Sequence, residues 1–313
     1  MENFPNPREF RLVGSASEEN KEALQEALGN KFHSHLDSLS DEFLEKLKNF
    51  EIPKSPDQIE IINSINEVLA KYIKSLGLDY HQLSADNYHV IKGDEYIKER
   101  GDDSTACFSS LTFSVFFNND AVSKNNLLFI NMALHETLHS AMHLAYGVID
   151  DEDDKEKYKY GIYRAGVAAH SYDGQPKHVH FKGLDEAIVS EMQKDVLQEV
   201  LRLPKIVSLF EEGTAEDDER IEFPYQKNRM VLNYICSEIA QQMPDEYKDE
   251  SEVKKEFFKA HISGHLLKIA HLVDDTFGKG SFRILGNMND DKESGQLHLE
   301  QFKKLRLNFK KQK

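Results

Sequence analysis

The sequence has few cysteines, no long apolar run and no excess of basic residues. Two cysteines among 313 residues are too few for the disulfide framework of a secreted scaffold. No uninterrupted apolar stretch approaches the ~20 residues that a membrane-spanning helix requires, so no membrane association is expected. The N-terminal residues lack a basic segment followed by an apolar run, so we also expect no signal peptide. These absences predict a soluble, cytoplasmic protein.

The charge balance is strongly acidic, with a formal net charge of −16. Binding to nucleic acid needs clustered Lys and Arg side chains, so nucleic acid is not an expected partner. An apolar content of 39% and a charged content of 30% are typical of a globular protein with a highly charged surface. The chain is long enough for one large or two ordinary domains, and it contains no internal repeat.

Apolar periodicity predicts an α+β fold in which helices predominate. Residues 1–79 are expected to form an N-terminal helical region, with a break at Gly29-Asn30 and a helix over 58–76 that Gly77 ends. Residues 80–183 contain the strand patterns, and residues 184–313 are expected to form a helical C-terminal lobe. The predicted strands cover 88–91 and 111–116, followed by a β-hairpin or small meander over 158–182. The predicted helices of the lobe begin at Leu184 and continue over 225–243, 250–261, 266–277 and 297–305. Two acidic runs, 150–157 and 211–222, are predicted to be loops.

The functional interpretation depends on residues 127–146, whose apolar positions predict a helix that ends before Gly147. This stretch contains His135-Glu136-Thr137-Leu138-His139, an H-E-x-x-H motif. Residues four apart lie on one face of a helix, so His135 and His139 can bind the same zinc ion. Glu136 lies beside that face, where its carboxylate can accept a proton from an attacking water. The alternative is a partly buried helix whose histidines only make local hydrogen bonds.

His143 lies a further turn along the predicted helix. Eight residues span about 12 Å of helix axis, so His143 cannot share an ion with His135 and is predicted to pack beside the site.

A catalytic zinc ion has three protein ligands and one position for water. The metzincin pattern H-E-x-x-H-x-x-G-x-x-H fails here, because Met142 and Ala145 stand at its glycine and third-histidine positions. The other common source is a glutamate on a second helix, and Glu186 lies at the start of the helix predicted from Leu184. The rival donors are Glu191 and the hairpin histidines His170, His178 and His180. Glu186 also has an interpretation as an N-terminal carboxylate that the helix dipole favours.

Through its H-E-x-x-H motif, and through Glu186-Ala187-Ile188 at the start of a later helix, the chain resembles the gluzincin clan of zinc metallopeptidases, the thermolysin-like enzymes, in a bacterial branch. The resemblance implies a zincin-like fold, with a small sheet and the motif helix in residues 80–183 and the third ligand in residues 184–313. It implies one zinc ion per chain, bound by His135, His139 and Glu186, with Glu136 as general base. It also implies a peptide or protein substrate.

Two features depart from the thermolysin pattern. The interval between His139 and Glu186 is far longer than in thermolysin itself. Ser190 stands where that pattern has an aspartate that orients a ligand histidine, so this supporting role is not assigned here.

The same resemblance raises two open questions about substrate binding. Zincins use an edge strand before the motif helix to hydrogen-bond an extended peptide, so the strand at 111–116 is either such an edge strand or an ordinary sheet strand. Tyr225, His178 and His180 are the candidate donors to the oxyanion of the tetrahedral intermediate. The rival functions are a catalytically silent regulatory or binding protein on a zincin fold, a helical interaction protein without a metal, and a zinc hydrolase of non-peptide amides.

Overall fold

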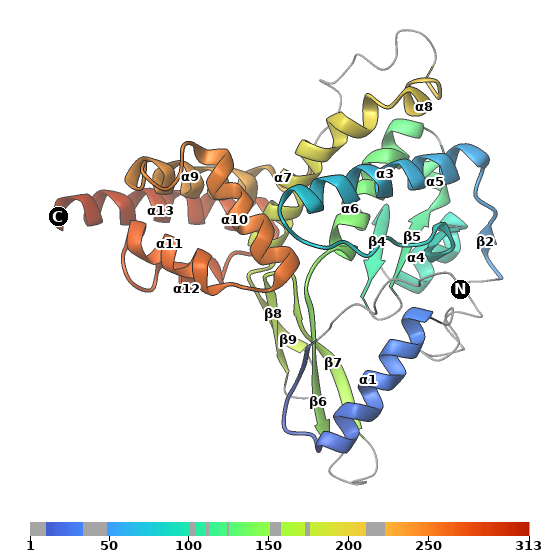
Figure 1. The fold of residues 1–313 in the computed structure, drawn as a ribbon, viewed down its shortest axis with the longest axis horizontal. Coiled ribbons are helices and arrows are strands. Elements are labelled where there is room, and N and C mark those ends of the chain that lie inside the picture. Colours follow the sequence, from blue (N-terminus) through green and yellow to red (C-terminus); the bar gives the residue numbers. More distant parts are fainter. Residues whose placement is uncertain are drawn as a thin grey trace. The chain divides into compact units, whose positions relative to one another are not determined.

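The computed structural model describes residues 11–33, 49–100, 104–110, 113–123, 125–150, 158–172, 176–210 and 223–312. It is an α+β structure in which helices predominate, as the sequence predicted (Figure 1). No helix in this described part of the chain is long and apolar enough to cross a membrane. The loop predicted at 211–222 lies outside the described residues, and so does the loop predicted at 150–157 except for Asp150, which ends a strand.

The chain separates into two compact units, each built from several segments. The first consists of Met1–Ala141, Val148–Tyr158 and Asp195–Glu222, and the second of Met142–Gly147, Lys159–Lys194 and Phe223–Lys313. The three regions predicted from the sequence divide the chain by residue pattern rather than by contacts, and they remain a prediction.

The first unit contains a four-stranded sheet in the order β2-β3-β5-β4. Its strands are β2 (Glu51–Ile52), β3 (Tyr88–Ile91), β4 (Ala106–Ser109) and β5 (Ser114–Asn118). β3 and β5 are parallel, and β2 and β4 run antiparallel to their neighbours. β5 is therefore an interior strand that is buried along its whole length. Of the two interpretations of the strand at 111–116, the ordinary sheet strand is correct and the edge strand is wrong. Leu111 and Thr112 themselves lie outside the described residues.

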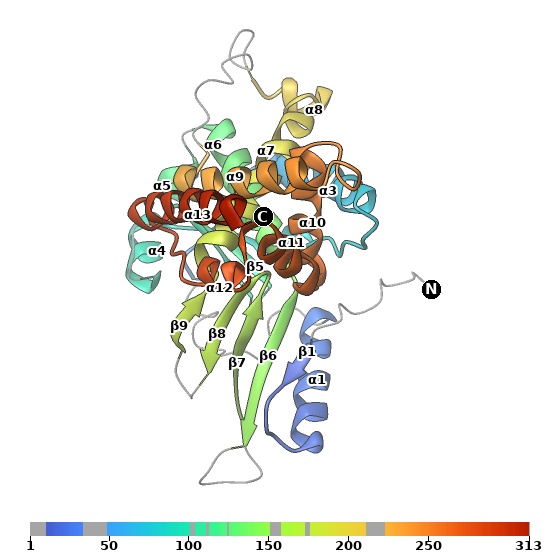
Figure 2. The same ribbon diagram turned by 90° about the vertical axis from the view of Figure 1, so that its left-hand side faces the viewer.

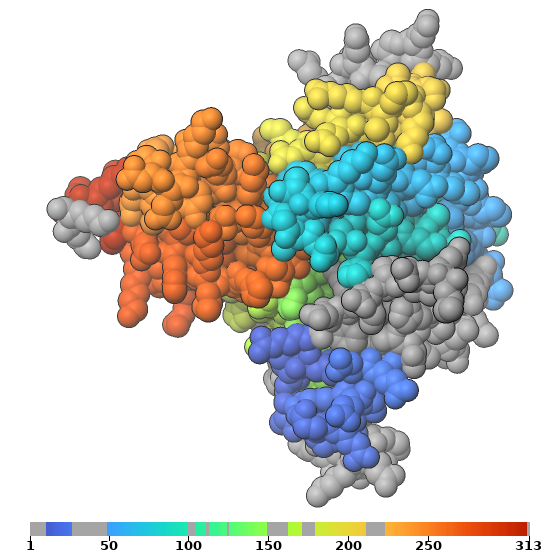
Figure 3. All heavy atoms as spheres, viewed as in Figure 1, coloured from blue at the N-terminus to red at the C-terminus, as the bar shows by residue number. Residues whose placement is uncertain are grey.

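Helix α3 (Pro56–Ser75) begins at a capping box formed by Ser55 and Gln58, and Gly77 with a φ of +79° follows it, as predicted. Its buried face consists of Ile61, Ile62, Ile65, Val68 and Leu69. α3 packs against α6 (Asn126–Ser140) and α8 (Pro204–Val207), and the yellow atoms of α8 lie against the blue and cyan atoms of α3 in Figure 3. Lys205 of α8 pairs with Glu60 at 3.0 Å and with Glu67 at 3.4 Å, both on α3.

One expectation for the N-terminal region needs correction. Helix α1 (Glu18–His33) continues through Gly29-Asn30, so the predicted break is wrong. A glycine inside a helix costs about 1 kcal/mol relative to alanine, which a helix can tolerate. The region also contains two short strands: β2 pairs with β3 in the four-stranded sheet, and β1 (Arg11–Val13) joins a second sheet.

That second sheet has the order β1-β6-β7-β8-β9. β7 (Tyr158–Ala165), β8 (Ala168–Tyr172) and β9 (Pro176–His180) lie side by side in Figure 2 as the antiparallel meander that the sequence predicted. β6 covers Leu144–Asp150. Helix α7 (Lys182–Leu201) follows the meander, and Leu184, Ile188, Met192, Val196 and Leu197 form its buried side, as predicted.

The C-terminal helices are α9 (Gln226–Gln242), α10 (Glu250–Ser263), α11 (Leu267–Phe277), α12 (Ser281–Leu285) and α13 (Lys292–Gln312). α9 packs along α13 and against α10 and α11 (Figure 1). Phe277 and Phe302 meet edge to face in the core of this group, with ring centroids 5.1 Å apart. The four predicted helices are present, although α13 extends well beyond residues 297–305 at both ends and α12 was not predicted.

Candidate metal centre

The motif helix α6 is shorter than the sequence predicted. The side chain of Asn125 caps its start by accepting a hydrogen bond from the Leu127 amide at 2.7 Å, and the helix ends at Ser140. The chain then enters β6 at Leu144, so Gly147 lies in a strand and does not stop the helix. His143 therefore lies in the connection between α6 and β6, and its predicted place on the motif face is wrong. Its amide donates to the carbonyl of His261 at 2.9 Å.

A buried hydroxyl pair ties α6 to β3. Thr137, inside the motif, donates its hydroxyl to the Ala133 carbonyl at 2.5 Å, and this hydroxyl lies 2.9 Å from the hydroxyl of Tyr88. Both side chains are wholly buried, and burial raises the pKa of Tyr88 to about 12. Because Thr137 lies between the two motif histidines in sequence, this contact fixes the rotation of the helix turn that carries them.

The motif histidines face each other at a separation that suits a shared ion. Their Nε2 atoms are 3.3 Å apart, and their rings lie 4.9 Å apart at 77°. Two nitrogens bound to one tetrahedral zinc ion at about 2.0–2.1 Å lie about 3.3–3.4 Å from each other. The same separation also permits a long hydrogen bond between neutral rings. The third donor is therefore the observation that separates a metal centre from a simple histidine pair.

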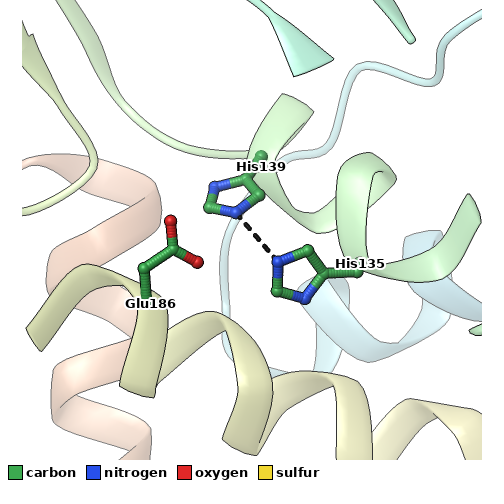
Figure 4. Close-up of side chains that lie close together, drawn as sticks. All are labelled: His135, His139 and Glu186. Carbon is green, nitrogen blue, oxygen red and sulfur yellow. Dashed lines mark hydrogen bonds between the residues drawn. The ribbon is translucent and has the colours of Figure 1, made fainter. Parts of the chain in front are cut away.

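Glu186 is the candidate for that third donor. One ligand atom from each of His135, His139 and Glu186 lies within 4.8 Å of the other two, and Figure 4 shows the Glu186 carboxylate directed toward both imidazoles. For these donor atoms to reach the separation of about 3.4 Å found in a tetrahedral zinc site, they would need to move closer by at most about 1.4 Å. Two histidines and one glutamate are a known donor set of catalytic zinc sites, so the residues present fit the metal that the resemblance implies.

Among the rival donors, Glu191 has other partners. Glu191 is 4% exposed and bonds to Arg229 Nε at 2.7 Å and to Lys254 Nζ at 2.9 Å. Burial alone would raise the pKa of Glu191, but the hydrogen bonds and charges of Lys254 and Arg229 outweigh it and hold the pKa below its usual value. Its carboxylate thus has two cations as partners and is not among the grouped donors.

Neither His170 nor His180 joins the metal-binding group found in the described part of the chain. Both are half-buried, and burial lowers the pKa of His170. The side chain of His178 lies outside the described residues. Tyr225 directly precedes α9 and has a φ of +57°, a backbone conformation that side-chain-bearing residues rarely adopt.

Glu136 is 8% exposed and directly follows His135 on α6. Its role as general base remains a prediction. Sequence reasoning gave no role to Asp185, which directly precedes Glu186, or to His261, whose Nδ1 lies 3.0 Å from Oδ1 of Asp185.

No family model, curated protein or solved structure that was compared with the chain matches it. The donor atoms of His135, His139 and Glu186 alone define the class of site, a candidate mononuclear metal centre of the His₂Glu type.

Proposed function

We propose that this chain is a zinc-dependent metallopeptidase with a zincin-like fold, similar to the gluzincins. In this proposal His135, His139 and Glu186 bind one zinc ion per chain and Glu136 is the general base. The observation that carries the proposal is the grouping of two imidazoles and one carboxylate from distant parts of the sequence. A complete H-E-x-x-H motif adds support, because a purely structural zinc site would not need Glu136.

Zinc held by these residues would lower the pKa of a water to about 7 and polarise the carbonyl of the substrate. Glu136 accepts a proton from the attacking water and transfers it to the leaving amine nitrogen.

The oxyanion of the tetrahedral intermediate needs a hydrogen-bond donor from the protein. Tyr225, His178 and His180 remain the candidates. The left-handed backbone conformation of Tyr225 favours Tyr225 as this donor, since such conformations cost energy and cluster at functional sites.

The first experiment is to measure zinc in the purified chain and in the variants Glu186→Ala and Glu199→Ala. Glu199 is an exposed glutamate on the same helix, so Glu199→Ala is the matched control. We expect about one zinc ion per chain in the wild type and in the control, and loss of zinc in Glu186→Ala. A wild-type chain that binds no zinc would show that the motif is coincidental.

The second experiment separates a peptidase from a catalytically silent zinc protein. Glu136→Gln keeps the size of the side chain and removes its basicity, so it should bind zinc normally. Cleavage of a peptide library should fall by at least about 100-fold, the usual contribution of a general base. If the wild type binds zinc and cleaves no peptide, the silent regulatory protein is the better description. Unchanged cleavage by Glu136→Gln would refute the assignment of the base.

A further inference from the structure

Asp185 directly precedes the metal-binding candidate Glu186, and its side chain is 8% exposed. Its Oδ1 accepts two hydrogen bonds, from the amide of Val167 at 2.8 Å and from Nδ1 of His261 at 3.0 Å. His261 is wholly buried on α10, and Val167 lies in the turn between β7 and β8. One carboxylate oxygen therefore connects the first turn of α7 to a β-turn and to a second helix.

These bonds are not an ordinary helix cap. A capping side chain accepts from an amide of its own helix, whereas Asp185 accepts from Val167, 18 residues earlier, and from a side chain 76 residues later. A carboxylate oxygen is an acceptor and an imidazole N–H is a donor, so we take Nδ1 of His261 as the donor in this contact. The pair therefore fixes the direction of both side chains.

The turn beside this pair leaves no room for a side chain. Gly166 has a φ of +59°, and a Cβ placed there would lie 2.3 Å from Asp185 Oδ1 and 2.4 Å from His261 Nδ1. Real Cβ atoms do not approach other atoms this closely. Gly166 thus lets the β-turn lie directly against the Asp185–His261 contact.

We propose that Asp185 and His261 are a positioning pair that holds Glu186 in the orientation needed to bind the metal. This inference rests on the proposed function, because it takes Glu186 as a ligand. Asp185 lies in the first turn of α7 and Glu186 directly follows it, and helix ends are the parts of a helix that fray. With Asp185 bonded to α10 and to the β-turn, this first turn cannot rotate independently of them. The Glu186 side chain therefore starts from a fixed backbone, which reduces the entropy lost on binding.

The test compares zinc affinity with the thermal stability of the metal-free chain. Asp185→Ala removes both hydrogen bonds, and Asp185→Asn retains an oxygen that can accept them. The matched control is Asp274→Ala, because Asp274 also accepts two hydrogen bonds, from the amides of Gly280 at 3.0 Å and Phe282 at 2.8 Å. Zinc Kd is measured by competition with a chromophoric chelator, and Tm by circular dichroism.

We expect Asp185→Ala to weaken zinc binding by about 10- to 100-fold, the usual effect of removing a residue that supports a metal ligand. Asp185→Asn should bind zinc nearly as tightly as the wild type. Asp274→Ala should lower the Tm of the metal-free chain and leave zinc Kd unchanged. If the role of Asp185 were purely structural, Asp185→Ala would behave like Asp274→Ala: the Tm of the metal-free chain would fall and zinc Kd would be unchanged.

A second pair of variants reaches the same contact without removing a hydrogen-bonding group. Gly166→Ala pushes a methyl group into Asp185 and His261, whereas Gly77→Ala has the same unfavourable positive φ, at +79°, with no atom within 4 Å. Only Gly166→Ala should weaken zinc binding. This comparison also decides the matter if Asp185→Ala does not fold.

The outcomes distinguish the two proposals. A wild-type chain that binds zinc, together with Asp185→Ala and Gly166→Ala variants of unchanged Kd, would overturn the positioning pair and leave the proposed function standing. A wild-type chain that binds no zinc would overturn both.

Discussion

Replacing Glu191 with glutamine should destabilise the fold more than any ordinary surface change. The Glu191 side chain is 5% exposed, and it bonds to Arg229 at 2.7 Å and to Lys254 at 2.9 Å. Removing one member of a buried ion pair leaves its partners without a counter-charge and costs about 3–5 kcal/mol.

The structure indicates the lower end of that range. Lys254 retains a second ion-pair partner, Glu250, at 2.8 Å. The guanidinium carbon of Arg229 still lies over the ring of Phe223, 5.2 Å from the ring centroid. A loss of about 3 kcal/mol corresponds to a fall in Tm of roughly 6–12 °C for a large domain. Because the chain has no tryptophan, far-UV circular dichroism is the suitable signal for urea and thermal unfolding.

Glu67→Gln is the matched control. Glu67 also lies between two lysines, Lys71 at 2.8 Å and Lys205 at 3.4 Å, but its side chain is 47% exposed. Exposed ion pairs contribute little because water and salt screen them, so the Tm of this variant should be close to that of the wild type.

The stability that Glu191 contributes should change with pH in a defined direction. The pKa of Glu191 is lowered in the folded state. Between the folded and the unfolded pKa of this group the unfolded chain binds more protons than the folded chain, so the stability of the fold rises with pH there. The stability that Glu191 contributes is present above its unfolded pKa of about 4.3 and is lost as the pH falls through the folded value. The difference between the wild type and Glu191→Gln should therefore shrink in acid. Equal stabilities at pH 7, or a difference that grows in acid, would refute this reasoning.

Two further changes test how α3 and α6 are held. Ser55→Ala removes the capping box of α3 and should lower the free energy of unfolding by about 1 kcal/mol in urea titrations; a Ser55→Thr variant, which keeps the hydroxyl, should lose less. Tyr88→Phe removes the hydroxyl partner of Thr137 in a dry interior and should cost about 1–3 kcal/mol by the same measurement, whereas no loss would mean that this contact does not stabilise α6.

Much of the fold could be predicted from local patterns. The buried face of α3, the meander of β7 to β9 and the helices of the C-terminal region have strong periodicity, so residue spacing was sufficient to predict them. Glu186 was also the donor favoured from the sequence, because two histidines and one glutamate are a common donor set of catalytic zinc sites, and it is the one that the structure groups with His135 and His139.

The errors arose where distant residues decide the local structure. The apolar spacing of Ala141 and Ala145 continues the helical pattern, yet the chain turns into β6 because the amide of His143 bonds to the carbonyl of His261, far along the sequence. The interior position of β5 depends on its pairing with β3 and β4, which its own residues do not reveal. In the same way, Glu191 could be set aside as a ligand only once Arg229 and Lys254 were found beside it.

The contact between Thr137 and Tyr88 has a consequence for recognising relatives in genomes. The usual five-letter motif leaves its third position open, and short open patterns return many chance matches. In this chain the third position needs a small hydroxyl side chain, because it is wholly buried and bridges the Ala133 carbonyl and a tyrosine 49 residues earlier in the sequence. A search profile that requires serine or threonine there, together with an upstream tyrosine, would discard most accidental hits.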